Sequence, residues 1–212
     1  MKYALKEWST TAEALGKGLV TAIWRKGGID DNPSIRAKYE SFEIKHTNFV
    51  FFPTYTHENL EKIKREFYFL YEQSNSVRKE IDIRIKYWAE IHEEIAVEKI
   101  DQLLNLSNEL VNSTEHLVSS WNLHPSHSGK LIILRVYKLA NPIIIPNSEE
   151  YKGCKSWVEI KADIPRAGSE AVLPYKEFNR KVRLIKELLK AEPESIPILP
   201  EIIEEEIFKE RP

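Results

Sequence analysis

The order of the expected elements predicts an α+β fold: a single mixed domain over residues 1–190, with a central sheet flanked by helices. Short apolar runs typical of strands and apolar stripes of helical period follow one another irregularly, and no internal repeat is visible. Residues 191–212 are acidic and rich in proline, and we interpret them as a C-terminal tail or strap. Regular alternation of strands and helices would instead favour an α/β fold, which is the alternative.

Five elements are expected in the first half of the chain. Leu5, Trp8 and Leu15 recur at helical spacing, which predicts a helix over residues 3–15. Apolar and charged residues alternate over 81–87, the clearest pattern of a half-buried strand in this sequence. The full set is a helix over 3–15, a strand over 19–24, one or two strands over 39–52, a helix from Thr56 to residues 74–76, and a strand over 81–87.

The second half is expected to contain two long helices and a group of strands, with a polar break at 124–129. Pro174 suits the first turn of a helix, where its missing N–H costs nothing, and an apolar stripe follows it. The full set is a helix over 97–111, strands over 131–139, 143–145 and 157–160, and a helix over 175–190.

The composition is that of a soluble globular protein from a reducing compartment. Apolar residues make up 42% and charged residues 30% of the 212 residues, which excludes a disordered chain. Cys154 is the only cysteine, so no internal disulfide can form. No apolar run approaches the roughly 18 residues of a membrane span, and the N-terminus lacks the apolar core of a signal peptide. We therefore expect a cytoplasmic protein with no membrane partner.

The net charge of −2 conceals an asymmetry between the two ends of the chain. Residues 191–212 hold seven Glu against one Lys and one Arg, a charge of −5, so the other 190 residues carry +3. That is a mildly basic domain, short of the strong positive footprint of many nucleic-acid-binding proteins. The expected helix over 175–190 carries six Lys or Arg against two Glu. We hypothesise that the acidic tail folds over this helix or engages a protein partner.

The densest group of candidate anion ligands is the segment Arg25-Lys26-Gly27-Gly28, which ends an apolar run. Two cations can pair with a phosphate, and two glycines let backbone amides approach it closely. The segment lacks the spacing of a P-loop, and no GxGxxG pattern occurs, so a standard nucleotide motif is not indicated. A tight turn flanked by solvated cations is the alternative.

A second group of polar side chains, Thr54, Tyr55 and His57, follows the apolar run that ends at Phe52. A hydroxyl, a phenol and an imidazole before a helix could bind an anion at its N-terminus or carry out acid–base chemistry. Thr56 could instead serve only as the N-cap of that helix.

Two Glu-x-Lys triplets, Glu43-Ile44-Lys45 and Glu159-Ile160-Lys161, suggest a metal-dependent nuclease. Residues two apart on a strand share a face, so a carboxylate could hold a metal beside a lysine. Asp30 or Asp31 could supply a further ligand to the first triplet. Alternating solvated faces explain both triplets equally well, and the histidines and Cys154 show no zinc spacing.

Arg135 interrupts the apolar run 131–137 and therefore requires a partner. That partner could be a bound anion or an internal carboxylate, and Glu7 in the expected first helix is one candidate for the carboxylate.

These motifs together resemble an uncharacterised bacterial family, the domain of unknown function 1802. The resemblance rests on LKEW at 5–8, RKGGI at 25–29, FPTY at 52–55 with His57, LRVY at 134–137, and GCKSWV at 153–158. It extends over roughly residues 4–185 and implies no assigned activity. Some members carry a restriction-endonuclease-type domain, which implies a link to DNA restriction or defence. Where the family often has a glutamine after its histidine, this chain has Glu58-Asn59.

Three functions follow from the sequence. The first is a module that binds nucleic acid or a phosphorylated ligand. Its anion site would consist of Arg25, Lys26, Gly27, Gly28, Thr54, Tyr55, His57 and Arg135. The second is a metal-dependent nuclease or another hydrolase, using Glu43 and Lys45 or the pair Tyr55 and His57. The third is a protein-interaction module acting through residues 192–212. The sequence indicates no particular cofactor.

Overall fold

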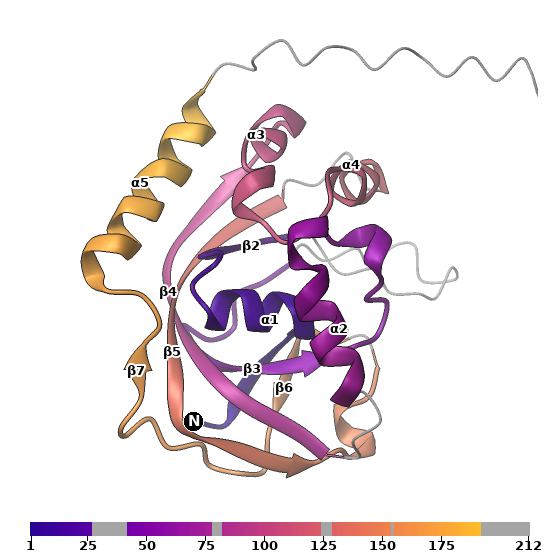
Figure 1. Cartoon of the computed structure of the whole chain (residues 1–212), viewed down its shortest axis with the longest axis vertical. Helices are drawn as coiled ribbons and strands as arrows, with labels where there is room; N and C mark the ends of the chain where they lie inside the picture. Colours follow the sequence, from indigo (N-terminus) through magenta and orange to yellow (C-terminus); the bar gives the residue numbers. More distant parts are fainter. Residues whose placement is uncertain (27–41, 78–81, 124–128, 154, 192–212) are drawn as a thin grey trace, which may run out of the picture.

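The fold is built on one mixed sheet of seven strands, seen in a computed structural model that describes residues 1–26, 42–77, 82–123, 129–153 and 155–191 (Figure 1). The sheet order is β2-β5-β4-β3-β1-β6, and β7 pairs with β5 outside this path. The strands are β1 (Tyr3–Trp8), β2 (Ala22–Arg25), β3 (Asn48–Thr54), β4 (Asp82–Val97), β5 (Gly129–Pro146), β6 (Trp157–Glu159) and β7 (Glu170–Ala171).

Most neighbouring strands are antiparallel, but β1 and β3 run parallel, with Ala4 opposite Val50 and Trp8 opposite Thr54. The C-terminal ends of β1 and β3 therefore lie at the same edge of the sheet. The long strands β4 and β5 stay paired over most of their length and contain two register shifts, between Ile85 and Tyr87 and between Ile91 and Glu93. Such irregularities bend a strand pair, and the sheet curls visibly in Figure 1.

Five α-helices are described, together with short 3₁₀ turns. In Figure 1, α1 and α2 lie within the curl of the sheet, and α5 runs along the outer side of β4 and β5. The helices are α1 (Ser9–Gly16), α2 (Tyr68–Val77), α3 (Ile100–Asn105), α4 (Thr114–Leu123) and α5 (Tyr175–Lys190). The 3₁₀ turns are η2 (Leu60–Lys62), η3 (Arg65–Phe67), η4 (Ser107–Glu109) and η5 (Glu149–Tyr151).

Apolar side chains are buried on both faces of the sheet. Along β3, Phe49 and Phe51 pack with α1 and α2, whereas Val50 and Phe52 face a second cluster with β4, β5 and β6. Burial on both faces explains why β3 is a continuous apolar run instead of an alternating one. A third cluster packs α3, α4 and α5 against β2, β4 and β5.

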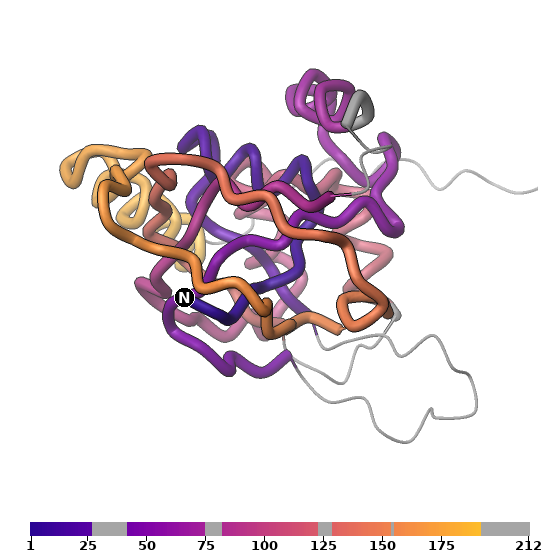
Figure 2. The backbone as a smooth tube through the Cα atoms, turned by 90° about the horizontal axis from the view of Figure 1, so that it is seen from below, coloured from indigo at the N-terminus to yellow at the C-terminus, as the bar shows by residue number. Residues whose placement is uncertain are grey.

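The expected helix over residues 3–15 is wrong in its first half. Residues 3–8 form β1, which lies between β3 and β6, and the helix begins only at Ser9. Figure 2 shows this N-terminal segment running beside the segment that follows β5. Ala4 and Leu5 are both buried, because β1 has neighbours on each face. A strand that is buried on both faces does not alternate between apolar and polar residues. Without that alternation, the apolar residues of this segment fitted the spacing of a helix equally well.

The structure also differs from the expected elements elsewhere. The predicted helix over 97–111 is divided, because β4 continues to Val97 and a 3₁₀ turn follows the short α3. The runs 131–139 and 143–145 belong to one strand, β5, in which Leu139 and Ile145 stay buried. The helix over 175–190 is confirmed as α5, with Pro174 in the N-cap position. No helix in the described part of the chain is long and apolar enough to span a membrane. Residues 192–212, including the predicted strap, lie outside that part.

Candidate functional site

A cavity of about 960 Å³ opens at the C-terminal ends of β1 and β3, beside β2. Side chains from the start of α1, from β4 and from α4 line it, together with the segments 53–57 and 147–156. Its volume lies at the upper end of the range for small-molecule sites, which is about 300–1,000 Å³. The cavity can therefore enclose a ligand of several rings or several charged groups.

The lining of this cavity is strongly cationic. Backbone carbonyls orient some of its lysines: Lys6 Nζ donates to the oxygens of Tyr151 and Gly153, and Lys26 Nζ donates to that of Trp121. Lys86 and Lys152 instead pair with Glu13 and Glu149. A carbonyl acceptor positions an ammonium group without removing its charge. The basic lining residues are Lys6, Arg25, Lys26, Lys62, Arg84, Lys86, Lys152 and Lys155, and the acidic ones are Glu7, Glu13 and Asp82. Eight cations against three carboxylates give an excess of five positive charges.

The structure brings together most of the residues that the sequence proposed as an anion site. The described residues of that set that line the cavity are Arg25, Lys26, Thr54, Tyr55 and His57. Gly27 and Gly28 lie outside the described residues. Arg135 does not line the cavity. Burial lowers the pKa of the Lys26 ammonium, as expected for a cation in a recess.

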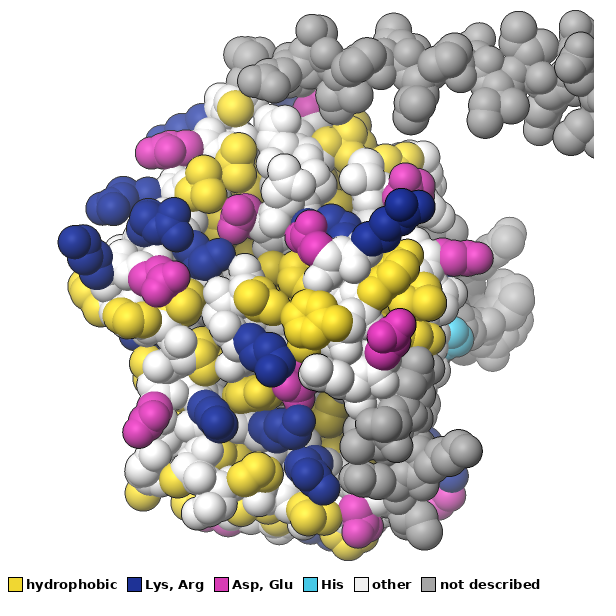
Figure 3. All heavy atoms as spheres, in the orientation of Figure 1, with side chains coloured by type: hydrophobic (Ala, Val, Ile, Leu, Met, Phe, Trp, Pro, Cys, Tyr) yellow, Lys and Arg dark blue, Asp and Glu magenta, His cyan; other side chains and the backbone are white. Residues whose placement is uncertain are grey.

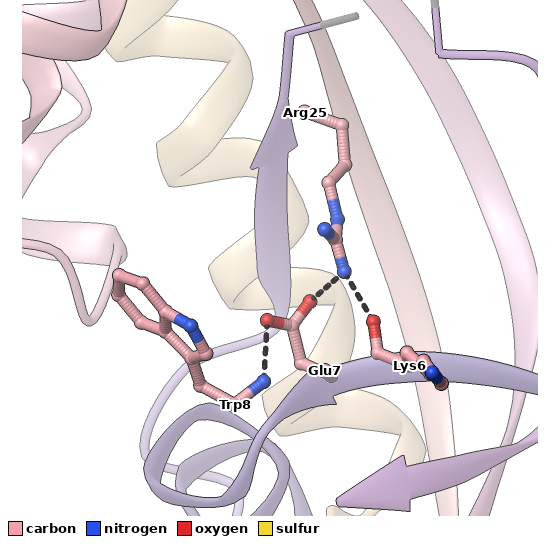
Figure 4. Close-up of polar contacts among 4 residues, drawn as sticks. All are labelled: Lys6, Glu7, Trp8 and Arg25. Atoms are coloured by element: carbon pink, nitrogen blue, oxygen red, sulfur yellow. Dashed lines mark hydrogen bonds and ion pairs between the residues drawn. The ribbon is translucent and has the colours of Figure 1, made fainter. Parts of the chain in front are cut away.

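Arg25 forms an internal ion pair with Glu7 (Figure 4). Its Nη2 lies 2.6 Å from Glu7 Oε2 and donates to the carbonyl oxygen of Lys6 at 2.7 Å. The other carboxylate oxygen of Glu7 accepts a hydrogen bond from the Trp8 amide at 2.9 Å. Arg25 is thus a structural cation whose charge is largely balanced by Glu7, a pairing that no sequence pattern predicts.

The segment from Thr54 to His57 forms a turn after β3. The backbone of His57 has φ of 62°, and its carbonyl oxygen accepts a hydrogen bond from Lys62 Nζ at 3.0 Å. Thr56 does not cap a helix, because Asn59 is the residue that caps the next 3₁₀ turn, by accepting from the Lys62 amide at 3.1 Å. The turn thereby fixes Lys62 at the cavity wall.

Trp8, Lys62 and His116 form a cluster in the cavity wall that the sequence did not reveal. Lys62 Nζ lies 6.0 Å from the centre of the Trp8 ring, and the Trp8 and His116 ring centres are 5.3 Å apart. Burial, and secondarily the charge of Lys62, lowers the pKa of His116 to about 4. His116 is therefore neutral at physiological pH. These residues come from β1, η2 and α4, and no short-range sequence pattern links them.

Arg135 lies on the face of the sheet that is covered by α5. Its guanidinium carbon is 4.8 Å from the centre of the Phe178 ring, and Glu90 is its cross-strand neighbour. The hydroxyl of Tyr137 donates to Glu90 at 3.0 Å, and burial followed by this contact raises the pKa of Tyr137. The expected pairing of Arg135 with Glu7 is wrong, because Glu7 belongs to β1 and binds Arg25.

The two Glu-x-Lys triplets do not form a metal site among the described residues. Glu43 and Lys45 precede β3 and lie on no strand, and Lys161 pairs with Glu150 at 2.5 Å. In the described part of the chain, no group of three or more His, Cys, Asp or Glu side chains is arranged to hold a metal ion. Asp30 and Asp31 lie outside that part.

Comparison with known protein families identifies the relatives of this chain. The family described as a domain of unknown function (DUF1802) matches residues 4–183. The chain belongs to this family. The match covers β1 to the middle of α5, and with them every described residue of the cavity wall. Glu58, where the resemblance leads us to expect a glutamine, is buried, and its Oε1 accepts the Thr10 amide at 2.8 Å. A glutamine Oε1 could accept the same hydrogen bond.

Among the curated proteins, none matches the chain in sequence. Among solved structures, the chain is similar to a mutant of ZmASCH from Zymomonas mobilis, with a TM-score of 0.42 and 11% sequence identity. That alignment covers 86% of this chain and 94% of the ZmASCH chain.

Proposed function

We propose that this DUF1802 protein is a binding module for ligands that carry phosphate groups, either nucleic acid or a small phosphorylated molecule. The observation that carries the proposal is the charge of the cavity wall, with eight Lys or Arg side chains against three carboxylates. Lysine binds phosphate as a point charge, and several lysines around one recess can meet several phosphates.

The arrangement of the lysines supports binding within the cavity. Lys6, Lys26 and Lys62 each donate to backbone carbonyls, so their ammonium groups are placed before a ligand arrives. A preorganised cation loses less side-chain entropy on binding. The recess also shields these charges from water, which strengthens their attraction for an anion.

A second basic surface competes with the cavity as the binding site. Lys and Arg side chains gather along the α5 edge of the molecule, where they mix with acidic side chains (Figure 3). Lys186 there pairs with Glu93 at 2.7 Å, and three cavity cations also pair with carboxylates, so ion pairing does not separate the two surfaces. Most Lys and Arg side chains of α5 are exposed, whereas the cations of the cavity line one recess. We therefore assign binding to the cavity. A role in DNA restriction or defence would use the binding of nucleic acid in this cavity. The alternative function, a metal-dependent nuclease, would require metal ligands from outside the described residues.

The proposal is tested by removing cations from the cavity and from α5 in separate variants. Lys26→Met and Lys155→Met keep the aliphatic stem and remove the charge, Lys176→Met does so on α5, and exposed Lys138→Met is the control. Affinity for a labelled single-stranded oligonucleotide and for pyrophosphate is measured by fluorescence anisotropy and calorimetry. Each cavity variant is expected to weaken binding of at least one probe about tenfold, the value of one charged hydrogen bond.

Two results would contradict the proposal. One is that neither probe binds the wild-type protein at low salt. The other is that Lys176→Met weakens binding while both cavity variants bind as the wild type does, which would transfer the site to α5. Folding of every variant is checked by circular dichroism, and Lys138→Met is expected to match the wild type throughout.

A further inference from the structure

The Trp8–Lys62–His116 cluster combines a partly exposed aromatic ring with a cation in the cavity wall. Lys6 and Arg25 of the same wall lie over the rings of Phe52 and Phe42, but both of those rings are buried. Trp8 is partly exposed at the junction of β1 and α1, where its indole lies apart from the Arg25–Glu7 pair (Figure 4). Lys62 Nζ lies 6.0 Å from the indole centre and is also anchored by the His57 carbonyl. An indole and an ammonium at this separation present an apolar face and a positive charge to the same ligand.

In the described part of the chain, no carboxylate balances the charge of Lys62. None of the ion pairs formed among the described residues involves Lys62. The contacts it makes with described residues are to the His57 carbonyl, to the Trp8 indole and to the imidazole of His116, which is neutral at physiological pH. An ammonium that has only neutral neighbours in a recess gains most from an incoming anion. Its own three N–H donors outnumber the single described acceptor, so it can bind a phosphate without breaking that contact.

The aromatic half of the cluster distinguishes the ligand from a simple anion. Inorganic phosphate would use Lys62 but gain nothing from an indole, and an apolar ligand would gain nothing from the cation. Nucleotides carry a flat base and a phosphate a few ångströms apart. Base–aromatic stacking next to cations is the common means by which proteins bind unpaired nucleotides. Neutral His116 offers one donor and one acceptor, which suits the polar edge of a base.

We propose that this cluster is a subsite for an unpaired nucleotide, with the base against Trp8 and its phosphate at Lys62. The inference rests on the proposed function and specifies the ligand of the same cavity. A base inside a duplex is stacked on both faces and cannot present one to an indole unless it is flipped out. The ligand is therefore a single strand or a free nucleotide, and these two sources share the chemistry that the subsite recognises.

The inference is tested by comparing ligands that have the same phosphates with and without bases. Full-length protein is titrated with a labelled oligothymidylate, with an abasic oligonucleotide of equal length, with a duplex, and with thymidine monophosphate. The oligothymidylate is expected to bind at least about fivefold more tightly than the abasic strand, the lower bound of one stacked base. Binding of the monophosphate would show that one nucleotide fills the subsite, and binding of the strand alone would show that neighbouring phosphates are required.

Variants of Trp8 then test whether this residue causes the difference in affinity between the strands with and without bases. Trp8→Leu is expected to abolish the preference for the strand with bases, and Trp8→Phe to retain part of it. Tyr3→Leu is the matched control, because Tyr3 is 43% exposed and does not line the cavity. Equal affinity of wild-type protein for the oligothymidylate and the abasic strand would overturn the nucleotide subsite and leave the phosphate-binding function intact. Tighter binding of the duplex would also overturn the subsite. Binding of none of the probes would overturn both proposals.

Discussion

At the scale of single residues, the guanidinium of Arg25 links two strands that are separated in the sheet by β5, β4 and β3. It binds both the carboxylate of Glu7 and the carbonyl of Lys6 on β1. A curled sheet brings β2 and β1 close at this end, and the ion pair holds them there. Glu7 is only 8% exposed, so its carboxylate depends on this partner.

Arg25→Met is therefore expected to lower the free energy of unfolding. Breaking a buried pair costs about 3–5 kcal/mol, and because Arg25 is partly exposed we expect about 2 kcal/mol here. Urea denaturation measures the loss. Glu7→Gln in the same background should restore part of it, since no unpaired charge then remains. A single Arg25→Met variant as stable as the wild type would show that the pair contributes nothing.

His116 should make the stability of the protein depend on pH. Its folded pKa of about 4 lies below the ordinary value of 6.5, so the unfolded chain binds a proton at higher pH than the folded one does. This contribution to stability is complete above about pH 6.5 and is lost as the pH falls towards 4. Unfolding free energies measured across this window should fall less steeply for His116→Gln than for the wild type. His92→Gln, which changes an exposed histidine against Phe178, is the control. An unchanged slope in His116→Gln would refute the assignment.

At the scale of secondary-structure elements, α1 packs against β4 where its last residue, Gly16, contacts the ring of Tyr87. A Cβ at Gly16 would lie 2.2 Å from Cζ of that ring. The ring cannot move away easily, because its hydroxyl donates to Glu13 at 3.1 Å and Glu13 also pairs with Lys86 at 2.6 Å. Burial and the neighbouring carboxylate raise the pKa of Tyr87 well above its usual range.

Gly16→Ala should destabilise the protein although alanine is the better helix former. Overpacking costs about 1–3 kcal/mol, and we expect about 2 kcal/mol, against a gain of at most about 1 kcal/mol from helix propensity. Thermal and urea unfolding measure the change. In a Tyr87→Leu background the penalty should shrink, because the rigid ring is gone. If Gly16→Ala instead stabilises the wild-type protein, the close packing of α1 on the Tyr87 ring is not what limits this position.

Elements with one clear apolar face could be predicted from the sequence, whereas β1 could not. Helix α5 has one buried stripe, which includes Phe178, Val182 and Ile185, and its predicted bounds are confirmed. Strand β1 is buried on both faces at Ala4 and Leu5, so it carries no alternation that would distinguish it from a helix.

At the scale of the whole molecule, the candidate site was only partly visible in the sequence. The segments at residues 25–26 and 54–57 each contain several polar side chains within a few residues. Such a group can be recognised from a short stretch of sequence. Trp8, Lys62 and His116 meet because β1 and β3 are parallel and α4 packs at the same end of the sheet. Arg135, though part of a local motif, faces α5 because its place on β5 assigns it to the opposite face. Which of these residues meet in space depends on the order and direction of the strands. The spacing of residues along the chain does not predict that order.

The distribution of charge over the whole chain predicts that the acidic C-terminal residues oppose the binding of nucleic acid. Residues 191–212 carry −5 and the rest of the chain +3, so the tail reverses the sign of the net charge. Replacing Glu204, Glu205 and Glu206 by Gln changes the net charge of −2 to +1. Affinity for a single-stranded oligonucleotide should then rise a few-fold at low salt. The difference should vanish near 1 M salt, where the Debye length is about 3 Å.

A second variant separates this charge effect from packing of the tail. Ile202, Ile203 and Ile207 replaced by Ser leave every charge in place but remove the apolar groups with which a strap could dock on α5. If charge alone opposes binding, the Ser variant should bind as the wild type does and only the Gln variant should bind more tightly. Equal gains from both variants would show instead that docking of the tail on the domain, and not its charge alone, opposes binding. No gain from the Gln variant at low salt would rule out an inhibitory role for the tail charge.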